Sequence, residues 1–268
     1  MTTPSLTIAI NMVAEVMMEH MKLGFPLELY APYEYSMVFN YLTYTYSILQ
    51  NNRRIMMFGF CEDLFRSKSN DFNISSDRLF NDEFNKRRSK MNPLQKLVCD
   101  QYIFYNAMQE LSIANALLYM LLMKHEYIKN PLRGQFGKDK AVNFIEENTY
   151  KRRFFLFKYV QMPRYQEYEE YENLYNKVHD DGEQEATNQM RSHFMNGMKM
   201  LNQLKSIDEK LRNTEILSNE ILDDLIKVSA TSLLLLMKAQ SCPPDKKIKV
   251  NIDSFATEWI PSVDMEFV

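Results

Sequence analysis

Glycine is scarce in this sequence, and that scarcity limits the folds open to the chain more than any other feature. Only six glycines and nine prolines occur among 268 residues. An all-β fold of this length needs many tight turns, and glycine and proline supply most of them. Long α-helices need few turns and exclude both residues from their interiors. The composition therefore predicts a mainly α-helical protein.

The first glycine ends a helical pattern within MKLGFPLELYAPYEY, residues 21–35. Gly24 stands where a helix C-terminus favours a residue that accepts a positive φ angle, and Pro26 cannot continue the helix. Pro32 suits the first turn of a second helix, and Glu34 complements the dipole there. We therefore expect a stiff corner between two helices. Apolar residues recur at steps of three and four on both sides of it: Leu6, Ile10, Val13, Met17 and Met21, then Tyr35, Phe39, Leu42, Tyr46 and Leu49.

A third helix is expected from Pro93 to about residue 130, and it is apolar on nearly all sides towards its end. Other elements should therefore cover it on several sides. The polar stretch before it, residues 66–92, is predicted to be an exposed connector. Its basic residues are Lys86, Arg87, Arg88 and Lys90. They are expected to form a solvated loop, and the alternative is that they bind an acidic partner such as ribosomal RNA.

Residues 131–182 mix short elements with closely spaced aromatic and charged residues. Arginine and tyrosine are enriched at the centres of protein interfaces. This makes four residues candidates for docking a partner, with packing inside the chain as the alternative: Arg152, Arg153, Tyr165 and Tyr168. Tyr168, Tyr171 and Tyr175 are spaced as one face of a helix.

Two further helices are predicted within residues 183–242, as an antiparallel pair of the kind that helical repeats stack. The first passes over Gly197, where a neighbouring backbone could come close. In the tail, residues 243–268, Ile248, Val250 and Ile252 alternate with polar residues in a strand pattern. We therefore predict a single repeat-like (TPR-like) helical scaffold over residues 1–268, with a helical core at about 5–60 and 93–130 and a short extended or β tail.

Charge and cysteine content exclude several classes of function. A net charge of −3 does not supply the positive surface that phosphate backbones attract, so the chain as a whole is not expected to bind nucleic acid directly. Cys61, Cys99 and Cys242 form no CxxC pair, which is typical of a reducing, intracellular compartment. No apolar run reaches the ~20 residues that a bilayer requires. We predict a cytoplasmic protein without membrane contact.

Catalytic motifs are missing from the sequence: no Walker A, GxGxxG, GxSxG or HExxH pattern occurs. RGQFGKDKA, residues 133–141, comes nearest to the R/Q-x-x-G-x-G/A loop of acetyltransferases, but Phe136 replaces its first glycine. His20 and His193 lie beside apolar residues on predicted helices, where a surface or half-buried position is expected. The sequence predicts a noncatalytic protein with no catalytic, cofactor-binding or metal-binding residues of its own.

The corner sequence LGFPLELYAPYEYSMVFNYLTYTYSIL resembles a signature of the large auxiliary subunit of the NatC N-terminal acetyltransferase. In that family a Leu-Gly-Phe, an apolar-Glu-Leu-Tyr run and a Glu-Tyr pair precede a Tyr-rich helix. Later stretches resemble the family in the same order: TYKRRFFLFKYVQMPRYQEY, SHFMNGMKML, and SLLLLMKAQSCPP with IDSFATEWIPSVDMEFV. The likeness covers most of residues 6–268. Members are usually more than twice as long, so the chain corresponds to their C-terminal part only.

The resemblance implies a helical scaffold that holds a GNAT-fold catalytic subunit and a small Sm-like subunit. That complex acetylates N-terminal methionine followed by a bulky apolar residue, often on ribosomes. Acetyl-CoA would bind to the catalytic partner, with no cofactor on this chain. No catalytic residue carries over. The residues that would shape the scaffold or a docking surface are those of the corner: Leu27, Glu28, Leu29, Tyr30, Glu34 and Tyr35.

Two other functions are compatible with these patterns. The repeat-like helix pairs would also suit a stand-alone adaptor that binds proteins unrelated to acetylation. An enzyme with an unrecognised site is the third hypothesis. Recovery of an acetyltransferase partner would distinguish the NatC auxiliary subunit from the stand-alone adaptor. Turnover by the purified chain alone would establish the enzyme.

Overall fold

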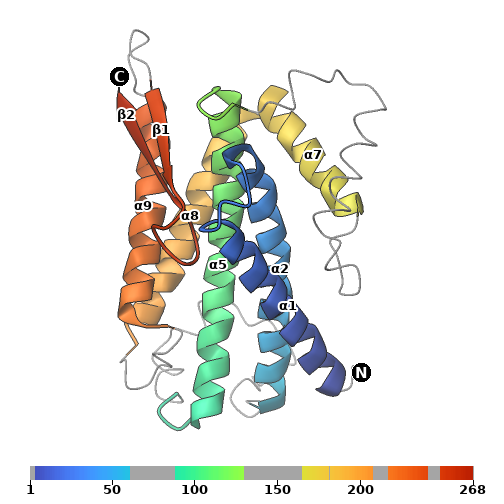
Figure 1. Cartoon of the computed structure of the whole chain (residues 1–268). Helices are drawn as coiled ribbons and strands as arrows, with labels where there is room; N and C mark the ends of the chain where they lie inside the picture. Colours follow the sequence, from blue (N-terminus) through green and yellow to red (C-terminus); the bar gives the residue numbers. More distant parts are fainter. Residues whose placement is uncertain are drawn as a thin grey trace.

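Helices make up most of the structure, a computed structural model that describes residues 4–60, 88–129, 165–180, 182–207, 217–240 and 248–267. The mainly α fold with a β tail is confirmed (Figure 1). None of the helices in these ranges is long and apolar enough to cross a membrane. In chain order the elements are α1 (Pro4–Gly24), the 3-10 turn η1 (Pro32–Glu34), α2 (Tyr35–Phe60), α5 (Pro93–Lys124), α7 (Tyr165–Asp180), α8 (Glu183–Lys205), α9 (Asn219–Gln240), β1 (Ile248–Asp253) and β2 (Ser262–Phe267).

Helix α5 forms the centre of the molecule, between α2 on one side and α8 on the other (Figure 1). Its start is a capping box, because Asn92 Oδ1 accepts from the Gln95 N–H at 2.9 Å and Gln95 Oε1 accepts from the Asn92 N–H at 3.0 Å. Pro93 follows at the first helical position, as predicted. Every side chain from Leu117 to Leu122 is at most 2% exposed. The expectation that this stretch is covered on several sides is confirmed.

The same helix ends at Lys124, several residues before the end expected from the sequence. Glu126 adopts a positive φ of 60°, which turns the chain back. The N–H groups of Tyr127 and Ile128 then donate to the Leu122 carbonyl, at 2.9 and 3.3 Å. Ile128 is 7% exposed and continues the apolar pattern by folding back onto the core, not by extending the helix.

The apolar faces predicted for α1 and α2 point inward. Met17 and Met21 of α1 are at most 5% exposed, and the α2 residues Tyr35, Phe39, Leu42, Tyr46 and Leu49 are at most 3% exposed. These side chains join the core cluster built around α5. The apolar residues that recur at steps of three and four in the sequence therefore identified the buried faces of both helices.

A buried arginine that the apolar pattern did not reveal joins α1, α2 and α5. Arg53 of α2 is 6% exposed. Its guanidinium donates to Gln101 Oε1 at 2.6 Å, to Asn11 Oδ1 at 2.7 Å and to Glu15 Oε1 at 2.8 Å. Hydrogen bonds from a charged donor are stronger than neutral ones. This network fixes the relative positions of the three helices.

Gly197 is a point of close approach between α8 and α5, as the sequence suggested. A Cβ added at this residue would lie 2.6 Å from Leu111 Cδ2 and 3.2 Å from the Ala107 carbonyl oxygen. The missing side chain lets the two helices pack at this distance. The predicted helix pair is confirmed as α8 and α9, which lie side by side (Figure 1).

The prediction that Arg88 belongs to a solvated basic loop is wrong. Its side chain is 2% exposed, and it forms an ion pair with the fully buried Asp100 of α5, with 2.5 Å between Nη2 and Oδ1. A carboxylate inside a core needs a cation beside it, which explains the burial of this arginine. Lys90 is exposed, as expected, while Lys86 and Arg87 lie outside the described residues.

The C-terminal tail, for which the sequence predicted a short extended or β structure, forms an antiparallel hairpin. Strand β1 pairs with β2 in a register that aligns Val250 with Met265 and Ile252 with Val263. Strand β2 packs against α9, and Val263 is fully buried. The predicted strand pattern of β1 is confirmed. Its hydrogen-bonding partner turned out to be the end of the same tail.

Buried tyrosines make the fold sensitive to alkaline pH. Tyr46 and Tyr119 are 0% exposed, and burial raises the pKa of both phenols well above the usual 10.0. In the unfolded chain these groups lose their protons near pH 10, so the stability they contribute is present below pH 10 and lost as pH rises. We expect the free energy of unfolding, measured by urea titration, to fall above pH 10.

A matched variant tests this prediction. Tyr46→Phe removes one raised pKa, so the fall in stability above pH 10 should become shallower. An identical profile for Tyr46→Phe and wild type would contradict the assignment.

Candidate docking surface

The corner between α1 and α2 is a compact turn. The N–H groups of Leu27 and Leu29 donate to the carbonyls of Leu23 and Gly24, at 3.2 and 2.9 Å. The Glu28 N–H donates to the Phe25 carbonyl at 3.0 Å. These bonds pair the carbonyls that a helix leaves open at its end. The corner is thus a fixed structure and confirms the predicted stiff joint.

Gly24 has a role different from the one predicted. Positive φ occurs at Glu28, at 52°, and at none of the glycines in the described residues. A Cβ on Gly24 would instead lie 2.1 Å from Cε2 of Tyr30. Glycine is needed here because the tyrosine ring packs directly against the backbone.

We expect Gly24→Ala to reduce the free energy of unfolding by about 1–3 kcal/mol, because the added methyl forces the Tyr30 ring off the helix end. In Gly24→Ala/Tyr30→Ala the clash is absent. The double variant should therefore be less destabilised than the sum of the two single variants. Urea titration of the four proteins measures this coupling, and strict additivity would contradict the contact.

An aromatic cluster holds the corner on α5. The Phe25 ring lies 4.9 Å from Tyr35 in an edge contact and 5.2 Å from Phe39 in a stacked one, measured between centroids. Tyr119 of α5 lies 5.2 Å from Tyr35. Glu34 is 7% exposed and its Oε2 accepts from the Ala31 N–H at 2.9 Å. Such ring pairs stabilise beyond their buried area, so the corner rests on a rigid base.

The C-terminal hairpin reaches the same corner. The Tyr35 and Ser254 hydroxyls hydrogen-bond to each other at 3.0 Å. Lys22 Nζ lies 3.4 Å above the centre of the Trp259 ring, and that ring contacts Phe104 of α5 edge-on at 5.0 Å. Segments more than 200 residues apart are therefore in contact. Sequence reasoning missed Lys22 and Trp259, because nothing in the local pattern of either segment indicates the other.

Lys22 is unusual for a lysine because the residue is only 5% exposed. Burial lowers its pKa, and the nearby carboxylates of Glu19 and Glu258 oppose that shift. The ammonium donates to Glu19 Oε1 at 2.9 Å. The indole face supplies a further attraction for the cation. Lys22 thus joins α1 to the hairpin turn by charge as well as by packing.

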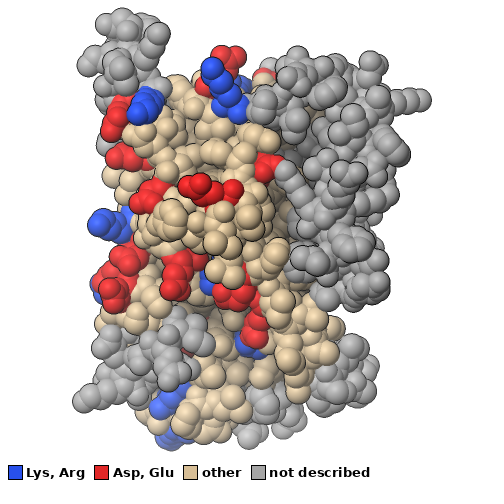
Figure 2. Space-filling view, viewed as in Figure 1, with Lys and Arg blue, Asp and Glu red and all other residues tan. Residues whose placement is uncertain are grey.

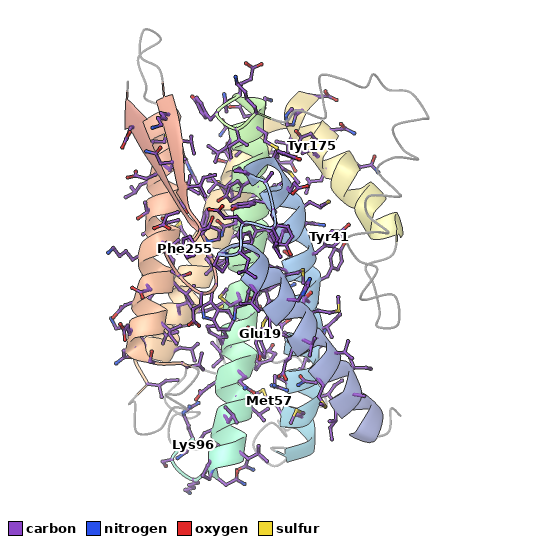
Figure 3. All side chains as sticks on the ribbon, viewed as in Figure 1. Glu19, Tyr41, Met57, Lys96, Tyr175 and Phe255 are labelled. Carbon is purple, nitrogen blue, oxygen red and sulfur yellow. The ribbon has the colours of Figure 1, made fainter. Side chains whose placement is uncertain are left out.

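Three of the predicted corner residues are at the surface. Leu27 is 63% exposed and Leu29 61%, and Glu28 between them is also exposed. Phe255, at 70% exposed, stands at the tip of the hairpin beside the corner (Figure 3). We call Leu27, Glu28, Leu29 and Phe255 the corner surface. Large apolar side chains held in the open on a rigid support are typical of a protein interface.

The other predicted site residues divide into two groups. Glu34 and Tyr35 are buried and Tyr30 is half-buried, so these three shape the corner from inside. Arg152 and Arg153 lie outside the described residues. Tyr165 and Tyr168 belong to the first turns of α7, with side chains outside the described set. A docking role for any of them stays a prediction.

Several titratable side chains in the described residues form pairs. His193 Nδ1 lies 2.9 Å from Glu110 Oε2, and His125 Nε2 lies 3.0 Å from Glu183 Oε1. In this part of the chain no group of three or more His, Cys, Asp or Glu is placed to hold a metal ion. The adjacent acids Asp223 and Asp224 are both exposed.

Acidic side chains gather in the middle and on the left of the face that carries the corner and the hairpin (Figure 2). Glu19, Glu28, Asp253 and Glu258 are all exposed. The Lys22 ammonium that balances Glu19 lies beneath this surface, so a partner that approaches meets carboxylates first.

Comparisons with known proteins agree with this architecture. A family profile described as "NAA35-like, TPR repeats" matches residues 3–263. A chain of the NatC complex solved with an Arl3 peptide and CoA superposes with a TM-score of 0.59 at 15% identity, over 98% of this chain and 41% of that one. A chain of the apo NatC complex gives a TM-score of 0.60 at 14% identity, with the same coverage. This chain thus spans about two fifths of their length. Comparison with curated protein sequences gave no significant match.

Proposed function

The chain belongs to the NAA35-like TPR-repeat family, and we propose that it acts as a noncatalytic auxiliary subunit of a NatC N-terminal acetyltransferase. The observation that carries the proposal is the family match over residues 3–263, nearly the whole chain. The family resemblance carried by the corner sequence and the later stretches is thereby confirmed. The likeness to chains of solved NatC complexes supports the same scaffold fold.

The proposed role is to hold other subunits in a fixed arrangement. A preformed surface binds with little loss of conformational freedom, which favours affinity. The corner meets this requirement, because hydrogen bonds and stacked rings hold its backbone while Leu27 and Leu29 remain exposed. Rigid long helices transmit the position of one bound partner to another.

Catalysis would take place on a partner chain. In this proposal a GNAT-fold subunit binds acetyl-CoA and transfers the acetyl group to N-terminal methionine before a bulky apolar residue, and a small Sm-like subunit completes the complex. The solved relatives include a NatC complex bound to CoA. We place the assembly in the cytoplasm, with ribosome association as part of the proposal.

Co-expression tests this function. The full chain carrying an affinity tag is produced together with the catalytic and small NatC subunits of the same organism, and purified in mild salt. We expect a stable complex that acetylates a peptide beginning Met-Leu, whereas the chain alone does not. Failure to recover the catalytic subunit would overturn the proposal. Recovery of unrelated proteins alone would favour the stand-alone adaptor, and turnover by the isolated chain would favour an enzyme.

A further inference from the structure

The turn between β1 and β2 reaches from the strands to the corner between α1 and α2 (Figure 1). We call residues 254–261 the hairpin turn. Its own side chains hold it together, because the N–H groups of Trp259 and Ile260 both donate to Thr257 Oγ1, at 3.1 and 2.8 Å. The Thr257 hydroxyl in turn donates to the Ile260 carbonyl at 2.8 Å. Such local bonds keep a turn in shape without help from the helices.

Few polar contacts fasten the hairpin turn to the helices. Among the described residues one hydrogen bond does so, between the Ser254 and Tyr35 hydroxyls at 3.0 Å, and no backbone hydrogen bond does. The Trp259 ring adds its contacts with Phe104 and with the Lys22 ammonium. Strand β2, by contrast, packs along α9. A unit that is firmly held at one end and fastened by a few side chains at the other can open locally.

Lys22 makes closure of the hairpin turn less favourable than an apolar side chain would. Its ammonium donates to Glu19 Oε1 and Oε2, at 2.9 and 3.1 Å, and this pair lies within α1 and does not need the hairpin. Closure adds the Trp259 ring and the Glu258 carboxylate, but it also removes water from the ammonium. Burial lowers the pKa of Lys22 by more than the two carboxylates raise it. The closed site therefore holds the charge less favourably than water does.

We propose that the hairpin turn is a strap that closes over the corner and opens as a unit, hinged at the two strands, and that the buried ammonium of Lys22 lets it open while the helices stay folded. Opening uncovers the side chains of Lys22 and Tyr35. It also carries Phe255 away from the rest of the corner surface. This motion takes place within the chain itself and does not depend on the proposed function.

Trp259 is the single tryptophan of the chain, and its indole N–H is a direct probe of opening. Nε1 is buried and makes no hydrogen bond to any described residue, so its exchange with D2O depends on the access of water to the ring. NMR of the purified full chain follows this proton and the backbone amides of Leu117 to Leu122 in α5. We expect the indole protection factor to be lower by about tenfold or more. Equal protection would mean that the turn opens only in global unfolding, and would overturn the proposal.

Lys22→Met tests the part played by the ammonium. Methionine keeps an unbranched side chain without the charge, so the protection of the Trp259 indole N–H should rise by about threefold or more. Lys249→Met is the matched control, because this lysine of β1 is exposed and its loss should change the indole protection by less than about twofold. Circular dichroism melting checks that both variants are folded. Unchanged or lower protection in Lys22→Met would overturn the role given to Lys22.

Tyr35→Phe tests the fastening from the other side. It removes the hydroxyl that bonds Ser254 and leaves the ring in place. The turn should open more often, so the indole protection should fall by about threefold to tenfold, while the amides of Leu117 to Leu122 keep most of theirs. An equal fall at both places, or no fall at the indole, would show that this hydrogen bond does not hold the strap closed.

Discussion

Replacing Arg88 with Met is expected to destabilise the protein by about 3–5 kcal/mol, because it leaves the Asp100 carboxylate without its ion-pair partner inside the core. Asp100 is 0% exposed and Arg88 2%. A buried charge that loses its partner keeps the full cost of its removal from water. Urea titration followed by circular dichroism measures the loss in free energy of unfolding.

The double variant Arg88→Met/Asp100→Leu separates lost charge pairing from lost packing. It removes both charges and puts apolar side chains in their place, so part of the stability should return. Lys90→Met, two residues along on an exposed lysine, should change stability by less than ~0.5 kcal/mol. If Arg88→Met behaved like Lys90→Met, the buried ion pair would not contribute as described.

The helical part of the fold could be predicted because residues close to one another in the sequence determine where a helix begins and which of its faces is buried. Tyr35, Phe39, Leu42, Tyr46 and Leu49 share one face by spacing alone, and all are buried. Pro93 after Asn92 marked the start of α5 for the same reason, since a capping box involves only neighbouring residues. Gly197 was recognised because a glycine inside a strong helix needs a packing reason.

The features that sequence reasoning missed depend on contacts between distant segments. Arg88 stands in a run of basic residues, and only the buried Asp100 twelve positions later explains its place. Gly24 is required by the ring of Tyr30, not by its own backbone angle. Strand β1 was visible as an alternating pattern, but its pairing with β2 follows from how the tail turns back.

The candidate surface was predicted only in part. Leu27, Glu28 and Leu29 belong to the corner sequence and are exposed, and their role in docking a partner stays a prediction. Phe255 of the corner surface was not predicted, because its place beside the corner (Figure 3) depends on contacts between segments far apart in the sequence, such as the hydrogen bond of Tyr35 with Ser254.

Trp259 is the other residue whose loss should have a large effect. The ring is 7% exposed, contacts Phe104 at 5.0 Å and lies under the Lys22 ammonium. Truncating a buried aromatic side chain to Ala typically costs about 3–5 kcal/mol. We expect Trp259→Ala to lower the free energy of unfolding by this amount and to speed amide hydrogen exchange in β1 and β2.

Two matched variants show whether the ring itself anchors the hairpin. Trp259→Phe keeps an aromatic ring for Phe104 and Lys22, so less than half of the loss should remain. Phe255→Ala removes an aromatic residue from the same turn, but that ring is 70% exposed and the change should stay within ~0.5 kcal/mol. If Trp259→Ala were as mild as Phe255→Ala, the ring would not anchor the hairpin, and the packing of β2 on α9 together with the Tyr35–Ser254 hydrogen bond would hold it in place.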